Sequence, residues 1–188
     1  MVLDKRKIKT KRLIERTFIA LLSEKEFSRV TIKEISEKAL ISKSTFYDHY
    51  VDKYALLDTI ILEYSNEFQT EIHERFKSVD EHNTLEVISS ITQDLALQNK
   101  NLSAILRATG TDRSLEINFR KILFMESFTY FESHPINKRF SSDFLAKMYA
   151  EMALASISYT LANYEDKELL KQQVDFVNLL QQSIIGKI

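Results

Sequence analysis

Apolar residues recur every three or four positions along most of the chain, which is the spacing of one face of an amphipathic helix. This spacing predicts a first helix over about residues 4–23 and a long helix over about residues 52–77. Further helices are expected over about residues 84–98, 101–108, 112–133, 142–162 and 166–186. With two short helices between residues 31 and 50, the pattern predicts an all-α protein of about nine helices.

The two short helices have recognisable start signals. Thr31 followed by Glu34 is a capping-box sequence, and Ser42 is a good N-cap for the second helix. Phe46 and Tyr50 lie one helical turn apart, so we expect both side chains to face inward and the helix to end near Tyr50. Two short helices around a tight turn, the second polar on its exposed side, favour insertion into a DNA major groove.

The second half of the chain carries broad apolar faces. Residues 122–131 are apolar around most of the helix, which is typical of a central or cavity-lining element. The last two predicted helices, 142–162 and 166–186, combine large apolar residues with small ones. We therefore expect a homodimer in which these two helices pair with their copies as a four-helix bundle. The alternative is that the same faces fill the core of a single chain.

Composition narrows the class of protein. The 188 residues include 2 Gly and 1 Pro, fewer than sheets with tight turns usually need, and no Cys, which excludes disulfides and cysteine-ligated metals. No apolar run approaches the roughly 20 residues of a membrane span, and the N-terminus lacks the apolar stretch of a signal peptide. We expect a soluble, cytoplasmic protein that makes no membrane contact.

Charge divides the chain at about the point where the short helices end. Residues 1–53 carry 13 Lys and Arg against 8 Asp and Glu, whereas residues 54–188 carry 13 against 19. A basic module joined to an acidic one suits a protein that touches phosphate with one end, although such imbalance also arises by chance. The predicted division is a DNA-binding domain over residues 1–53 and a second domain, which contains the dimerisation helices, over residues 54–188.

Candidate DNA contacts follow from side-chain chemistry at the second short helix. Lys43 can donate to guanine, Thr45 offers a hydroxyl and a methyl, and Ser44 allows close approach to bases. Polar groups around these three suit phosphate oxygens. The predicted DNA-binding set is Thr31, Ser42, Lys43, Ser44, Thr45, Tyr47, His49 and Lys53. For His49 a structural role at the helix end is the alternative, and for the whole motif it is a helical hairpin without a DNA role.

The first helix begins with a cluster of cations that local helix stability does not explain. The cluster comprises Lys5, Arg6, Lys7, Lys9, Lys11 and Arg12. Positive charge at a helix N-terminus opposes the helix dipole, so an anionic partner is expected. The alternative is a solvated tail, for the residues before Lys9 in particular.

The segment from Ala39 to Tyr50, with Asp52-Lys53 and Leu56-Leu57 after it and Phe27 and Thr31-Ile32-Lys33-Glu34-Ile35 before it, resembles the signature of the TetR/AcrR family of bacterial transcriptional regulators. The resemblance covers roughly residues 8–62. It implies an all-helical homodimer with an N-terminal helix-turn-helix domain and a C-terminal ligand-binding and dimerisation domain, which here corresponds to residues 54–188. By position, Thr31, Lys43, Ser44, Thr45, Tyr47, His49 and Lys53 correspond to the family's usual DNA contacts.

Two positions depart from the family pattern. Leu40 stands where the family usually has the turn glycine, and Ser44 where it often has another. A left-handed turn residue costs leucine roughly 1 kcal/mol or more, so either the turn is rearranged or Leu40 packs inward. A side chain at Ser44 adds a contact or sets the helix slightly back from the groove.

The resemblance also implies an effector pocket between the middle helices. By position its residues would be Leu102, Ile105, Leu106, Phe119, Leu123, Phe128 and Tyr149, and the alternative for each is a plain core residue. Arg107, Arg113 and Arg120 suit either an anionic ligand or surface pairing with Asp112 and Glu116.

Nothing in the sequence predicts catalysis. No HExxH, Gly-rich phosphate loop or nucleophile elbow occurs, and the four histidines do not cluster, so we expect no enzyme, metal or cofactor. The prediction is a repressor that a small-molecule ligand releases from a palindromic double-stranded DNA operator. One alternative is a DNA-binding member without an inducer, controlled by a protein partner or acting in chromosome organisation. Another is an interaction protein that has lost DNA binding.

Overall fold

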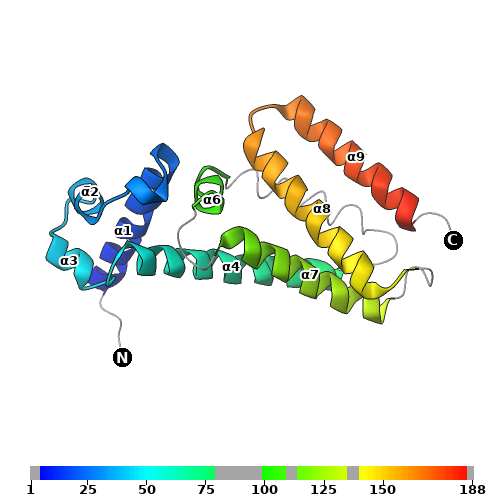
Figure 1. The fold of residues 1–188 in the computed structure, drawn as a ribbon, viewed down its shortest axis with the longest axis horizontal. Helices are drawn as coiled ribbons and strands as arrows, with labels where there is room; N and C mark the ends of the chain where they lie inside the picture. Colours follow the sequence, from blue (N-terminus) through cyan, green and yellow to red (C-terminus); the bar gives the residue numbers. More distant parts are fainter. Residues whose placement is uncertain (1–4, 79–98, 109–113, 135–139, 186–188) are drawn as a thin grey trace. The chain divides into compact units, whose positions relative to one another are not determined.

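The computed structural model describes residues 5–78, 99–108, 114–134 and 140–185, and over these residues every regular element is a helix (Figure 1). The elements are α1 (Lys5–Glu24), the short 3₁₀ helix η1 (Phe27–Arg29), α2 (Ile32–Lys38), α3 (Lys43–Tyr47), α4 (Lys53–Ser78), α6 (Asn99–Leu106), α7 (Leu115–Ser133), α8 (Ser142–Ala162) and α9 (Lys167–Ile185). The predicted all-α fold is confirmed. The helix predicted over residues 84–98 lies outside the described residues.

The helices belong to two compact units. One contains the described residues of Met1–Tyr64 and Lys100–Leu115, and the other those of Ser65–Asn99 and Glu116–Ile188. Helix α4 takes part in both, because the division falls between Tyr64 and Ser65. The functional boundary expected after residue 53 stays a prediction.

The first unit is built around apolar side chains that α1 and α4 direct at the short helices. Ile14, Phe18 and Leu21 of α1 are fully buried, as are Phe46 of α3 and Leu57 of α4. Burial of five such side chains contributes roughly 1.5–3 kcal/mol each before conformational entropy is counted. The expected inward orientation of Phe46 is thereby confirmed.

The second unit packs the C-terminal part of α4 against α7. The Phe68 ring stacks on Phe119 with 3.8 Å between ring centroids, and Asn118 Nδ2 donates to Ser65 Oγ at 2.9 Å. Farther along, His73 Nδ1 lies 2.9 Å from Glu126 Oε2. Apolar stacking and polar pairs therefore alternate along one α4–α7 contact.

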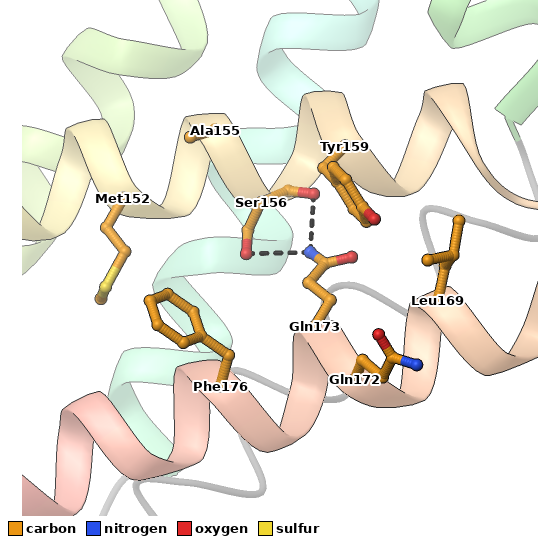
Figure 2. A pocket seen from close by; sticks show the side chains of 8 residues that line it. All are labelled: Met152, Ala155, Ser156, Tyr159, Leu169, Gln172, Gln173 and Phe176. Carbon is orange, nitrogen blue, oxygen red and sulfur yellow. Dashed lines mark hydrogen bonds between the residues drawn. The ribbon is translucent and has the colours of Figure 1, made fainter.

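Helices α8 and α9 run antiparallel and side by side (Figure 1). Ser141 caps α8, and the Asp166 carboxylate accepts hydrogen bonds from the first amides of α9. The Gln173 side chain joins the two helices, since its Nε2 donates to Ser156 O and Ser156 Oγ at 2.9 Å each (Figure 2). An open groove of about 390 Å³ lies along this seam. It is lined by Met152, Ala155, Ser156, Tyr159, Leu169, Gln172, Gln173 and Phe176.

Candidate nucleic-acid interface

The turn between α2 and α3 is a left-handed helix cap formed without glycine. Leu40 has φ 53°, its N–H donates to Glu37 O at 3.2 Å, and the Ile41 N–H donates to Ser36 O at 3.0 Å. These two bonds define a Schellman motif, which requires a left-handed residue at the position of Leu40. The Leu40 side chain is 93% exposed. Both expected accommodations, a rearranged turn and inward packing, are therefore wrong, and no side-chain packing offsets the conformational cost.

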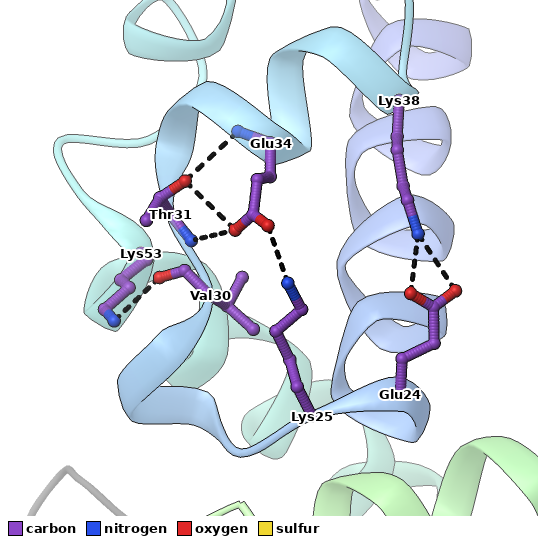
Figure 3. Close-up of polar contacts among 7 residues, drawn as sticks. All are labelled: Glu24, Lys25, Val30, Thr31, Glu34, Lys38 and Lys53. Atoms are coloured by element: carbon purple, nitrogen blue, oxygen red, sulfur yellow. Dashed lines mark hydrogen bonds and ion pairs between the residues drawn. The ribbon is translucent and has the colours of Figure 1, made fainter.

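Helix α2 starts at the predicted capping box. Thr31 Oγ1 accepts from the Glu34 N–H at 3.2 Å, and Glu34 Oε2 accepts from the Thr31 N–H at 3.1 Å (Figure 3). Lys25 Nζ lies 2.6 Å from Glu34 Oε1, and this hydrogen bond, with those from Thr31, lowers the pKa of the Glu34 carboxyl. A second pair, Lys38 with Glu24, ties the end of α2 to α1 at 2.7 Å. Thr31 thus stands at an exposed, rigidly held helix start; its predicted phosphate contact stays a prediction.

The start of α3 presents short polar side chains to solvent. Ser42 is the N-cap, with its Oγ accepting from the Thr45 N–H at 3.0 Å and lying 2.8 Å from Thr45 Oγ1. Lys43 and Ser44 are exposed, and no ion pair to Lys43 occurs among the residues that the structure describes. The Thr45 hydroxyl is already engaged with Ser42. The base contacts of Lys43, Ser44 and Thr45 stay predictions.

The end of α3 divides its aromatic residues between core and surface. Tyr47 is 54% exposed with its ring against the edge of Phe46, whereas Tyr50 is 6% exposed. The Tyr50 N–H still bonds to Phe46 O at 3.0 Å, so the helical turn reaches its predicted end although α3 itself stops at Tyr47. The half-buried His49 ring lies beside Tyr50. Tyr47 and His49 remain predicted phosphate contacts.

A polar chain behind α3 connects it to α1 and α4. Tyr50 Oη donates to Glu15 Oε1 at 2.7 Å, and Lys11 Nζ contacts both Glu15 and Glu63 of α4. Burial, followed by the bond to Glu15, raises the pKa of the Tyr50 phenol. The hydrogen bond to Glu63, followed by that to Glu15, outweighs burial and raises the pKa of Lys11. Lys11, expected among the cations facing an anionic partner, is thus engaged within its own unit.

Lys53 is placed differently from the other predicted contacts. Its ammonium donates to the carbonyl oxygens of Phe27, Ser28 and Val30 at 2.9, 3.1 and 2.8 Å. It also lies 4.6 Å from the centroid of the Phe27 ring. Burial lowers the pKa of this ammonium. Sequence reasoning gave no sign of these bonds, because the acceptors are backbone atoms 23 to 26 positions away.

The residues expected around an effector pocket fall in both units. Leu102 and Ile105 belong to the first unit and Phe119 and Leu123 to the second, and each is 3% exposed or less. Leu106, Phe128 and Tyr149 are half-buried. Burial raises the pKa of the Tyr149 phenol. The burial of Leu102, Ile105, Phe119 and Leu123 agrees with the alternative that they are plain core residues. The effector pocket itself stays a prediction.

The remaining charged candidates are on the surface. Arg120 pairs with Glu116 and Glu151 at 2.9 Å each, which matches the surface alternative for this arginine. Arg107 is exposed, and Arg113 lies outside the described residues. Within the described ranges, no three His, Asp or Glu side chains converge as metal ligands would, and no helix is long and apolar enough to span a membrane.

Comparison with known proteins agrees with this geometry. Residues 19–60, from the middle of α1 into α4, match the family model of bacterial regulatory proteins, tetR family. This segment therefore resembles the DNA-binding part of the tetR family of bacterial regulatory proteins. The resemblance to this family that was expected from the residues around the turn is confirmed.

A relative of known sequence shares part of this chain. YxbF of Bacillus subtilis, described as an uncharacterized HTH-type transcriptional regulator, is 38% identical over 60 residues, which are 31% of this chain and 16% of that protein. The likeness to this relative is therefore confined to a small part of its length.

Solved structures extend the likeness to nearly the whole chain. NalD of Pseudomonas aeruginosa, the secondary repressor of the MexAB-OprM multidrug efflux pump, superposes with a TM-score of 0.71 at 18% identity, covering 91% of this chain and 96% of its own. FadR of Bacillus subtilis, solved with stearoyl-CoA, gives 0.69 at 16% identity, covering 94% and 98%. At these identities the likeness shows a shared fold.

Proposed function

We propose that this protein is a transcriptional regulator that binds a palindromic DNA operator as a homodimer and is released by a small molecule. The observation that carries the proposal is the exposed polar start of α3, held by the buried Phe46 and the Tyr50–Glu15 bond. A rigid short helix with Lys43 and Ser44 at its tip fits a major groove. The setting would be the cytoplasm, where the DNA is.

DNA binding is tested by fluorescence anisotropy against the region upstream of the protein's own gene and against a randomised library with selection. We expect a selected palindrome and an affinity that falls steeply with salt. Lys43→Ala should change the selected sequence, whereas Tyr47→Phe should weaken binding to all sequences equally. Selection that yields no consensus, with equal weak binding to every duplex, would refute the proposal.

The homodimer is proposed to form through α8 and α9. Both helices expose a large apolar side chain that lines the groove in Figure 2: Tyr159 of α8 is 42% exposed and Phe176 of α9 60%. Contiguous apolar surface of this kind marks an interface. NalD and FadR share the fold, and the family resemblance implies the same dimer.

The dimer is tested by sedimentation velocity on the full chain. Phe176→Glu places a charge in the proposed interface and should raise the dimer dissociation constant at least tenfold, since burying an unpaired carboxylate is costly. Lys171→Glu, on the same helix but outside the groove lining, should stay dimeric. A Phe176→Glu protein that sediments as the wild type does would overturn this interface.

The effector is proposed to bind the second unit, near the half-buried Phe128 and Tyr149. FadR was solved with stearoyl-CoA, which supports an apolar ligand class for this fold. A ligand at 100 times its Kd stabilises the protein by about 2.7 kcal/mol, so a thermal-shift screen with acyl chains and aromatic acids is sensitive enough. A hit must also lower operator affinity; failure of every hit to do so would favour control by a protein partner.

A further inference from the structure

Lys53 is the first residue of α4, but its side chain forms hydrogen bonds outside this helix. A cation in the first turn opposes the helix dipole, so the local sequence gains nothing from it. The ammonium instead turns to the segment that precedes α2, where it donates to three carbonyl oxygens; Figure 3 shows the bond to Val30. An ammonium has three N–H donors, and three acceptors at 2.8 to 3.1 Å use all of them.

The surroundings of Lys53 are arranged for a compact cation. The three acceptors are the carbonyl oxygens of Phe27 and Ser28 in η1 and of its C-cap, Val30. Phe27 O also accepts from the Val30 N–H at 3.1 Å. The Phe27 ring lies on one side at 4.6 Å and the Tyr54 ring on another at 5.7 Å from the nitrogen. Positive charge at a helix C-terminus and over aromatic faces is favourable on both counts.

The bonded groups stand at the two ends of the helix-turn-helix. Val30 O lies just before Thr31, the N-cap of α2, and Lys53 follows directly on Asp52, which caps α4 through its bond to the Ala55 N–H. Residues 31–52 therefore form a loop whose ends are joined by one side chain. Loosening that junction would change the angle between α3 and the rest of the unit.

We propose that Lys53 is a positioning residue for DNA recognition: its ammonium joins the two ends of the helix-turn-helix and makes no phosphate contact. The inference rests on the proposed DNA-binding function, and it replaces the phosphate role that the position of Lys53 suggested. The structure favours it because every donor of the ammonium is already engaged at hydrogen-bonding distance.

Salt dependence of operator binding separates the two roles. A lost phosphate contact lowers the slope of log affinity against log salt by about 0.9. We expect Lys53→Gln to weaken binding roughly tenfold with the slope within 0.3 of the wild-type value, as for loss of hydrogen bonds to a charged group. A drop of the slope by about 0.9 would overturn the proposal.

Lys53→Arg gives the sharper contrast. A guanidinium keeps the charge and binds phosphate at least as well, but its planar fork cannot direct three donors to three carbonyls around one point. Positioning therefore predicts that Lys53→Arg also loses roughly tenfold in affinity. Affinity equal to or above that of the wild type would show a phosphate contact and would overturn the proposal.

Amide hydrogen exchange tests the same inference without DNA. The Arg29 N–H bonds to Glu26 O and the Val30 N–H to Phe27 O, so both amides report on the η1 turn. We expect both to exchange at least fivefold faster in Lys53→Gln and Lys53→Arg, since the protection depends on local opening. Lys33→Gln removes the same charge at an exposed position of α2 and should leave the exchange rates of both amides unchanged.

The outcomes distinguish the inference from the function on which it rests. Unchanged exchange at both amides in both Lys53 variants would overturn the positioning role whatever the protein binds. Faster exchange of the two amides in the Lys53 variants, in a protein that selects no DNA sequence, would support the structural role of Lys53 and refute only the proposed DNA-binding function.

Discussion

Leu40 offers the most direct test of stored conformational strain in this protein. Its left-handed backbone, φ 53°, costs a residue with a Cβ atom roughly 1–2 kcal/mol. Its side chain is 93% exposed, so almost no contact offsets that cost. Leu40→Gly removes the strain but restores freedom to the unfolded chain, which costs about 0.4–1 kcal/mol. The net expectation is a gain of about 0.5–1 kcal/mol in the free energy of unfolding.

The assay is urea unfolding of the full chain, followed by far-UV circular dichroism and by hydrogen exchange at the Ile41 amide, which reports on the turn itself. Leu40→Ala is the matched control, because alanine keeps the Cβ atom and hence the strain while removing the rest of the side chain. The expected order of stability is glycine first, with alanine and leucine equal within about 0.3 kcal/mol. Glycine no more stable than alanine would refute the argument from backbone strain.

Three further substitutions follow from the polar contacts. Tyr50→Phe removes the bond to Glu15 and should cost about 1–3 kcal/mol. Because the folded-state pKa of Tyr50 is raised, its stabilisation is complete below the ordinary value near 10 and is lost above it, so the wild-type advantage should shrink at higher pH in urea titrations. Thr31→Ala should lower the free energy of unfolding by about 1 kcal/mol through loss of the cap. Gln173→Ala should cost about 1–2 kcal/mol through loss of its bonds to Ser156.

Each of these substitutions has a control in the chain. Tyr47→Phe removes an exposed phenol and should leave the free energy of unfolding unchanged. Thr31→Ser keeps a capping hydroxyl. Gln172→Ala removes an amide at the exposed position next to Gln173. Equal losses in a variant and its control would contradict the assigned contact. For Tyr50, a pH-independent difference from the wild type would contradict the link between its burial and its raised pKa.

Local signals in the sequence proved sufficient where the structure depends on neighbouring residues. The Thr31 capping box and the Ser42 cap each depend on residues within three positions, and the inward side of Phe46 follows from its helical spacing to Tyr50; the structure has all three. Their energetics are short-ranged, so the pattern alone determines them. The family resemblance likewise rested on the contiguous segment 39–50 and its flanks.

The conformation of Leu40 and the contacts between residues far apart in the sequence were not predictable in the same way. We expected the strain of a left-handed Leu40 to be avoided or offset by packing. The Schellman hydrogen bonds instead hold Leu40 left-handed while its side chain stays in solvent. The Lys53 acceptors are main-chain oxygens, which every residue type carries, so no residue pattern marks them. Lys11 appeared as one of six clustered cations, and only the fold brings Glu63 to it.

These long-range pairs change what the basic charge of the first 53 residues means. Lys11, Lys25, Lys38 and Lys53 are directed at acceptors of their own unit, so their charges hold the helix-turn-helix together. Each phosphate neutralised adds about 0.9 to the salt slope. A count of cations would therefore overstate the slope, which depends instead on exposed side chains such as Lys43 that have no ion pair among the described residues. In the proposed DNA complex, the Lys11–Glu15–Tyr50 contacts would already hold the segment that follows α3, so less ordering would oppose binding.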